Sequence, residues 1–143
     1  MNILFFLMPK ADTVYIDSNS TIRQCLEKMK AHGYSTIPVI NEDGSFCGAI
    51  SHGDLLWHIV DENKFEIKTQ EQCYIKDIVR NYWYRTIKID AELNELVDII
   101  TTQNFVPVVD DRNLYVGIIT RKDIINYLYK ISKDYNFSTY MYK

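Results

Sequence analysis

The sequence predicts an α+β fold, built from two β-α-β-β-α repeats that pack against each other with pseudo-twofold symmetry. The first observation is internal similarity, because residues 37–56 reappear without a gap as residues 106–125. Four marker residues recur 69 positions later: Pro38, Gly48, Ser51 and Asp54 correspond to Pro107, Gly117, Thr120 and Asp123. The second observation is length, because 143 residues can build one domain-sized core whereas a repeat of about 60 residues buries little by itself. The repeats are therefore expected to share an interface, with duplicated clefts beside it.

The composition narrows the possible functions. Hydrophobic residues make up 47% and charged residues 24% of the chain, which is typical of a globular protein. A net charge of −3 argues against a nucleic-acid partner, because nucleic-acid binding depends on clustered lysine and arginine. The apolar run at residues 3–8 is too short for a signal peptide core or a membrane span, so no membrane partner is expected. The three cysteines and three histidines stand at no metal-ligand spacing, and we expect a cytoplasmic protein without disulfides or a metal site.

The first repeat begins with a short strand and a helix. Residues 13–16 alternate apolar and polar side chains, as on a half-buried strand. Ser20 and Thr21 can cap the following helix, and Gly33 can end it. The expected buried face of this helix consists of Ile22, Leu26 and Met29.

A β-hairpin and a second helix complete the first repeat. Residues 37–40 form an apolar strand, residues 42–44 have turn chemistry, and residues 46–50 form the returning strand. The second helix begins near His52. Its apolar residues are Leu55, Leu56, Ile59 and Val60. Residues 61–74 are polar without a clear period, which indicates the connection between the repeats.

The second repeat follows the same order. Residues 74–79 look like a short helix that leads into it, as residues 3–9 lead into the first repeat. Residues 86–89 match the entering strand, the hairpin turn falls at residues 110–113, and the final helix occupies about residues 121–132. The expected buried face of the intervening helix consists of Leu93, Val97 and Ile100. The predicted domain boundaries are residues 1–73 for the first repeat with its lead-in and connection, and residues 74–143 for the second repeat with its tail.

The same polar motif follows each hairpin. A glycine, two apolar residues, a hydroxyl residue and an aspartate occur in order, with Ser51 and Asp54 in one copy and Thr120 and Asp123 in the other. Between a strand and a helix, these side chains lie beside free backbone N–H groups, which is a favourable place for an anion. The pattern is equally that of a capping box, in which both side chains satisfy backbone donors. The two interpretations are compatible, because a capping hydroxyl can also face a phosphate.

This arrangement resembles the paired cystathionine-beta-synthase-type (CBS) domains, or Bateman module, of the small stand-alone bacterial type. The resemblance covers residues 8–131, and both copies have the apolar-Pro-Val strand, the polar turn, the glycine and the Ser/Thr-x-x-Asp motif. It implies that adenine nucleotides bind in two clefts. In each cleft the aspartate of one copy would hold the ribose hydroxyls, and the hydroxyl residue of that copy would contact phosphate. The adenine would lie against the residues just before the proline of the other copy. The resemblance also implies a homodimer, for which Trp57, Trp83 and the tyrosines of residues 135–143 are candidate contacts.

Carried over by position, the resemblance implies two sets of ligand-binding residues. The Thr120 cleft would use Thr120, Arg121, Lys122 and Asp123 with Tyr34, Ser35, Thr36, Lys10 and Asp12. The Ser51 cleft would use Ser51, His52 and Asp54 with Gln103, Asn104 and Phe105. A carboxylate can accept both hydroxyls of a ribose, and Tyr34 and Phe105 are candidates to face the purine. Arg121 and Lys122 can neutralise phosphate whereas His52 is mostly neutral at pH 7, so we expect the Thr120 cleft to bind more strongly.

The resulting hypothesis is a regulatory module that senses AMP, ADP or ATP and signals to a partner protein, with no cofactor beyond this regulatory ligand. One alternative is a cyclic di-AMP receptor, and another is an interaction scaffold with vestigial clefts. An enzyme is not expected, because neither aspartate has a second titratable group in its motif, and the sequence has no nucleophile elbow or phosphate-binding glycine loop.

Overall fold

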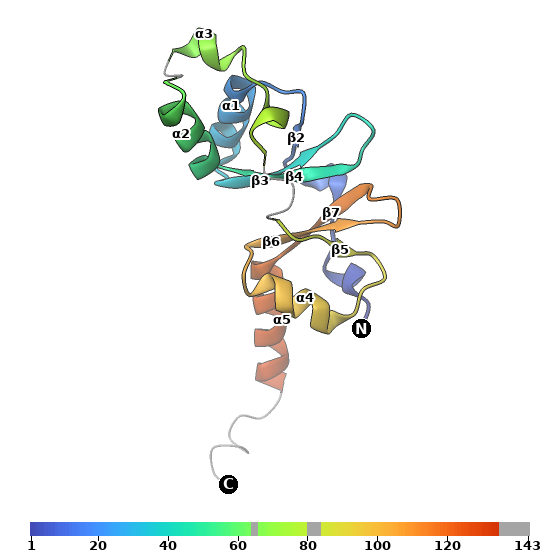
Figure 1. Ribbon diagram of the computed structural model, residues 1–143. Helices are drawn as coiled ribbons and strands as arrows, with labels where there is room; N and C mark the ends of the chain where they lie inside the picture. The colour runs from blue at the N-terminus through green and yellow to red at the C-terminus, as the bar shows by residue number, and fades with distance from the viewer. Residues whose placement is uncertain (64–65, 80–83, 135–143) are drawn as a thin grey trace.

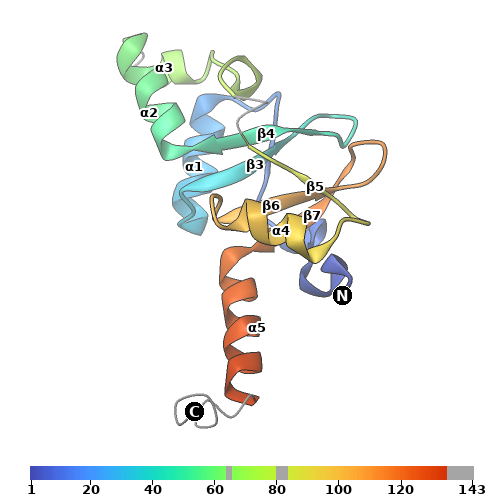
Figure 2. The same ribbon diagram turned by 60° about the horizontal axis from the view of Figure 1, so that its bottom comes forward.

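The computed structural model describes residues 1–63, 66–79 and 84–134 and has two α+β repeats whose sheets face each other (Figures 1 and 2). In chain order the elements are η1 (Ile3–Phe6), β1 (Met8–Pro9), η2 (Lys10–Asp12), β2 (Ile16–Asp17), α1 (Ile22–His32), β3 (Thr36–Ile40), β4 (Phe46–Ser51), α2 (His52–Asp61), α3 (Ile67–Gln70), η3 (Ile75–Asp77), β5 (Ile87–Lys88), α4 (Leu93–Ile100), β6 (Phe105–Val109), β7 (Tyr115–Thr120) and α5 (Arg121–Asp134). The sheet orders are β2-β3-β4 and β1-β7-β6-β5. The predicted fold class is confirmed.

The two hairpins show the pseudo-twofold symmetry most directly. Strand β3 pairs antiparallel with β4, and β6 pairs with β7 in the equivalent register, each with an irregularity before its last residue pair. The hairpin tips exchange backbone hydrogen bonds: Phe46 N–H donates to Asn113 O and Tyr115 N–H donates to Gly44 O, both at 3.0 Å. Positions 44 and 113 are equivalent, and both have positive φ. This reciprocal pairing fixes one repeat against the other beside a shared apolar layer of Ile40, Phe46, Val109 and Tyr115.

The first helices of the two repeats, α1 and α4, bury equivalent faces. Helix α1 is also capped as its sequence predicts. In α1, Thr21 and Gln24 form a capping box, and Gly33 ends the helix in the left-handed conformation. The buried residues of α1 are Ile22, Cys25 and Met29, and those of α4 are Leu96, Ile99 and Ile100. The expected burial of Val97 is wrong, because Val97 is 42% exposed. Leu96, equivalent to Cys25, faces the sheet instead, and the adjacent residue on a helix points elsewhere.

The first strand of each repeat is shorter than predicted, and the connection between the repeats contains a helix that was not predicted. Strand β2 begins only at Ile16, because the residues before it turn toward the second repeat, where Tyr115 Oη donates to Thr13 Oγ1 at 2.9 Å. Strand β5 is likewise limited to two residues. The connection between the repeats contains a further helix, α3, which packs beside α1 and buries Gln70. Its short length and polar composition hid it from the periodicity of the sequence.

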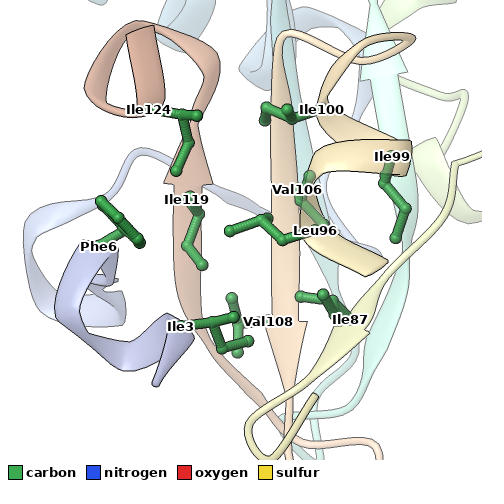
Figure 3. Close-up of a cluster of buried hydrophobic side chains, with 10 residues drawn as sticks. All are labelled: Ile3, Phe6, Ile87, Leu96, Ile99, Ile100, Val106, Val108, Ile119 and Ile124. Carbon is green, nitrogen blue, oxygen red and sulfur yellow. The ribbon is translucent and has the colours of Figure 1, made fainter. Parts of the chain in front are cut away.

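Each lead-in segment packs on the opposite repeat. The side chains of Ile3 and Phe6 point from η1 toward β7 and belong to the core of the second repeat, as Figure 3 shows, and β1 pairs antiparallel with β7. Conversely, Ile75 lies in the core of the first repeat, where its N–H donates to Ser20 O at 2.8 Å. The short helix expected near residue 75 is present as η3. The exchange ties the repeats together through their cores as well as through the hairpin tips.

The described helices include none that is long and apolar enough to cross a membrane.

Candidate ligand-binding cleft

A cavity of about 140 Å³ lies where the two repeats meet. Its walls come from the lead-in of the first repeat, from the start of β3, from the start of β6 and from the end of β7. The lining residues are Met8, Asp12, Thr13, Val14, Tyr34, Thr36, Ile37, Pro38, Asn104, Phe105, Ile118 and Thr120. Both repeats contribute to the lining, because the pseudo-twofold relation brings the starts of β3 and β6 to the same side of the interface.

The cavity combines residues from both predicted sets. Asp12, Tyr34, Thr36 and Thr120 come from the set predicted for the Thr120 cleft, and Asn104 and Phe105 come from the other set. Sequence reasoning missed the apolar part of the lining, which includes Met8, Val14 and Ile118. Residues 13 and 14 follow Asp12 directly in the chain, so extending the predicted lead-in segment by two residues would have included them.

Thr120 and Asp123 occupy the start of α5. Thr120 Oγ1 accepts a hydrogen bond from the Asp123 N–H at 3.2 Å, so the hydroxyl caps the helix while lining the cavity. Asp123 is half-buried and lines a groove of about 770 Å³ between α5 and residues 5–9. Within the described ranges, the Asp123 carboxylate has neither a hydrogen bond nor an ion pair. It is therefore open to a ligand hydroxyl or N–H group.

Ser51 and Asp54 at the start of α2 are arranged differently. Ser51 Oγ accepts from the Asp54 N–H at 3.1 Å, and Asp54 Oδ2 accepts from the Ser51 N–H at 2.9 Å. These reciprocal bonds make a complete capping box. The Asp54 carboxylate thus holds its own backbone, whereas the equivalent carboxylate of Asp123 does not.

The cations of the predicted Thr120 cleft do not gather at Thr120. Arg121 donates through Nε to Ile100 O at 2.9 Å and through a terminal nitrogen to Thr101 O at 3.5 Å, which satisfies carbonyl groups at the end of α4. Lys122 is exposed. Lys10 lies over the ring of Tyr15, with its ammonium 5.3 Å from the ring centroid.

Three other predicted residues stabilise the local backbone. Ser35 O accepts from the His52 N–H at 2.9 Å, and Asn104 O accepts from the Arg121 N–H at 2.8 Å, which is the equivalent bond in the second repeat. Gln103 is buried; its side-chain amide bonds both the N–H and the carbonyl of Arg85 and also donates to Phe105 O. These contacts hold the strand starts that form the cavity wall.

Two aromatic residues border the cavity in different environments. Tyr34 is 51% exposed, and its ring stacks on His32 with a 6.4 Å centroid separation and a 12° interplanar angle. Phe105 is buried, with its ring centroid 5.0 Å from that of Tyr84. Burial raises the pKa of Tyr84 to about 12, against smaller lowering effects from a hydrogen bond at Phe105 and the charge of Arg121. Tyr34 therefore has the more accessible ring for stacking.

The described residues contain no group of three or more histidine, cysteine, aspartate or glutamate side chains placed to hold a metal ion.

The fold is that of a tandem-repeat module with a cavity between its two repeats. The chain belongs to the CBS-domain family, whose model matches residues 7–61 and 75–130. An uncharacterised protein of Methanopyrus kandleri is 26% identical over 118 residues, which cover 81% of this chain and 58% of that protein. The chain thus spans little more than half of this relative.

Solved structures share the fold. One is CbpB in complex with c-di-AMP, with a TM-score of 0.86, 23% identity, and coverage of 96% of this chain and 91% of that chain. Another is CBSX2 in complex with AMP, with a TM-score of 0.74, 20% identity, and coverage of 92% and 98%. At these identities the likeness establishes the common architecture of two packed CBS repeats.

Proposed function

We propose that this protein is a regulatory module that binds an adenine nucleotide in the cleft between its repeats and signals to a partner protein. The observation that carries the proposal is the inter-repeat cavity, whose walls include Tyr34, Phe105 and Thr120. A largely apolar pocket with a few convergent polar groups is the usual form of a small-molecule site. The AMP complex of CBSX2 and the c-di-AMP complex of CbpB, both of the same fold, support this class of ligand.

In the proposed complex, different residues in and beside the cavity contact the purine, the ribose and the phosphate of the nucleotide. The exposed ring of Tyr34 offers a stacking surface for a purine, and the carboxylate of the half-buried residue Asp123 can accept the hydroxyls of a ribose. Thr120 Oγ1 lies at the N-terminus of the 14-residue helix α5, where the backbone favours negative charge. Since Asp54 is engaged in its capping box, we propose the Thr120 cleft as the stronger of the two sites.

A regulatory rather than a catalytic role accords with this chemistry. Binding through stacking, hydroxyl and helix-terminus contacts requires no proton transfer or nucleophile. The output then depends on a difference in affinity between two states of the module, since a ligand shifts an equilibrium only by its differential binding.

Cyclic di-AMP is a second candidate ligand. Met8 lines both the 140 Å³ cavity and the 770 Å³ groove beside α5, so the two spaces adjoin at this residue. A ligand with two adenosine units can place one unit in the cavity and extend the other along the groove. The c-di-AMP complex of CbpB supports this alternative.

Calorimetry and thermal unfolding with adenosine, AMP, ADP, ATP and cyclic di-AMP test the proposal. A ligand at 100 times its dissociation constant is expected to stabilise the protein by about 2.7 kcal/mol, which is several degrees for a chain of this size. Tighter binding of cyclic di-AMP than of AMP would select the second candidate. No binding by any adenine compound would contradict nucleotide sensing and favour an interaction scaffold.

We further propose that the module forms a homodimer through helices α2 and α5. Large apolar side chains are exposed at equivalent positions of the two helices: Leu56 and Val60 on α2, and Ile125 and Tyr129 on α5. Trp57, also on α2, is 61% exposed, while Trp83 and residues 135–143 lie outside the described residues. Equivalent apolar faces on two pseudo-symmetric helices suit a second copy, because a twofold dimer matches like surfaces.

Analytical ultracentrifugation of a Leu128→Asp variant tests the dimer. Leu128 is 53% exposed on α5, and a charge there is expected to convert the dimer to a monomer at micromolar concentration, because it would be desolvated in the interface. Ile67→Asp on α3, where the side chain is 55% exposed, is the control and should leave the mass unchanged. A monomeric wild-type protein, or equal effects of both variants, would contradict this interface.

A further inference from the structure

Tyr84 occupies the position in the second repeat that Thr13 occupies in the first. Ile16 and Ile87 pair with equivalent residues of β3 and β6, and Thr13 and Tyr84 each lie three residues before them. This register differs by two residues from the one expected from the sequence, which matched residues 86–89 to the entering strand. Thr13 lines the inter-repeat cavity. The pseudo-twofold relation therefore places Tyr84 at the counterpart of that cavity, the predicted Ser51 cleft.

Phe105 forms an aromatic pair with Tyr84. Phe105 is the counterpart of Thr36, since each begins the first strand of its hairpin, and Thr36 also lines the cavity. The ring centroids of Tyr84 and Phe105 are 5.0 Å apart, with an interplanar angle of 39°. Phe105 is buried and borders the cavity as well, so it lies between the two clefts. Two rings therefore stand where the Thr120 cleft has two small threonine side chains, and they fill that space.

A buried glutamine holds the aromatic pair in place. The side chain of Gln103 accepts a hydrogen bond from the Arg85 N–H at 2.8 Å, and it donates to the carbonyl groups of Arg85 at 3.0 Å and Phe105 at 3.2 Å. These bonds tie the residue after Tyr84 to the start of β6. The counterpart of Gln103 is Tyr34, which is 51% exposed and lines the cavity. The second repeat is thus closed at the position where the first repeat is open.

We propose that Tyr84 occupies the Ser51 cleft in place of a ligand, so that each chain binds one nucleotide, in the Thr120 cleft. The phenol ring packs on Phe105 and has a backbone hydrogen bond at the same residue, which are contacts that a planar purine would need there. The carboxylate of Asp54 is engaged in the capping box of α2, which agrees with a cleft that holds no ligand. This inference rests on the proposed function and adds the number of sites and the residue that sets it.

Calorimetric titration with AMP and with adenosine counts the sites. The wild-type chain is expected to bind one equivalent of each compound. Tyr84→Thr introduces the residue found at the equivalent position and is expected to bind a second equivalent, with lower affinity because Asp54 remains in its capping box. Tyr84→Phe is the matched control, because it keeps the ring and loses only the hydroxyl, and it should bind one equivalent. Circular dichroism verifies that each variant is folded.

The outcomes separate this inference from the proposed function. A second equivalent in Tyr84→Thr but not in Tyr84→Phe supports the closed cleft, whereas two equivalents in the wild-type chain, or one in folded Tyr84→Thr, overturn it. If Tyr84→Thr does not fold, Tyr84→Leu, which keeps more apolar contact with Phe105, is titrated in its place with the same expectation. If no adenine compound binds the wild-type chain, the proposed function fails; adenosine binding by Tyr84→Thr alone would still support a cleft closed by Tyr84, and its absence would overturn that too.

Discussion

Gly117→Ala is expected to release β1 from β7 and to lower the free energy of unfolding by roughly 2–4 kcal/mol. A Cβ atom at position 117 would lie 2.1 Å from the carbonyl oxygen of Met8 and 2.9 Å from Leu7 Cδ1, and the backbone there has φ +154°. The obstructing oxygen belongs to the backbone of β1, which pairs with β7 through Met8 and Pro9, so it cannot move without breaking that pairing. Urea unfolding followed by circular dichroism measures the loss.

Gly33→Ala provides the control for backbone conformation. Gly33 also has positive φ, at +72°, but a Cβ atom there would meet no heavy atom within 4 Å. Its replacement should therefore cost only about 1 kcal/mol, the usual penalty for alanine in the left-handed region. Equal losses in the two variants would show that the close approach of β1 is not what makes glycine necessary at position 117. Since Met8 lines the cavity, Gly117→Ala should also weaken ligand binding.

Asp123→Ala is expected to weaken nucleotide binding by about tenfold to a hundredfold, because hydrogen bonds to a charged group contribute about 1.5–3 kcal/mol. The carboxylate lines the groove beside α5 and, within the described residues, is not committed to another protein group. Its effect on folding should be small, at about 0.3–1 kcal/mol, since only its favourable position in the first turn of α5 is lost. Calorimetry with AMP and with cyclic di-AMP measures the affinity change.

Asp54→Ala should give the opposite result. Its carboxylate accepts the Ser51 N–H at 2.9 Å, so its removal breaks the capping box of α2 and should cost about 1 kcal/mol of stability. Binding in the Thr120 cleft should change little. Equal affinity losses in both variants, or none in Asp123→Ala, would contradict the proposed ranking of the two clefts.

Local sequence signals predicted the regular elements of the fold. Gly33 marks the end of α1 through its left-handed conformation, and the Pro38 and Pro107 hairpins follow from short apolar strands around polar turns. Both depend on residues a few positions apart, so a single sequence suffices. The duplication then predicted the symmetry, because two copies of one pattern adopt one local structure.

Contacts between segments far apart in the sequence decided which helix faces are buried and which side chains reach the cavity. Val97 and Leu96 are adjacent apolar residues on α4, and only the direction of the helix toward its sheet decides that Leu96 is buried. Likewise, Arg121 follows Thr120 directly and was expected to neutralise phosphate, but its guanidinium donates to the carbonyl groups at the end of α4. Tyr84 carries no motif signal and meets Phe105 only in the folded chain.

The sequence by itself determined that this protein is a doubled CBS-type α+β module with a Ser/Thr-x-x-Asp motif after each hairpin, because repeats and short-range patterns are readable along the chain. Only the tertiary structure decided that each lead-in packs on the other repeat, that one cavity combines residues from both predicted sets, and that Asp54 caps a helix while Asp123 stays open. The physical reason is that these features arise from packing between segments far apart in sequence, where side-chain volume and unsatisfied backbone groups select the partners.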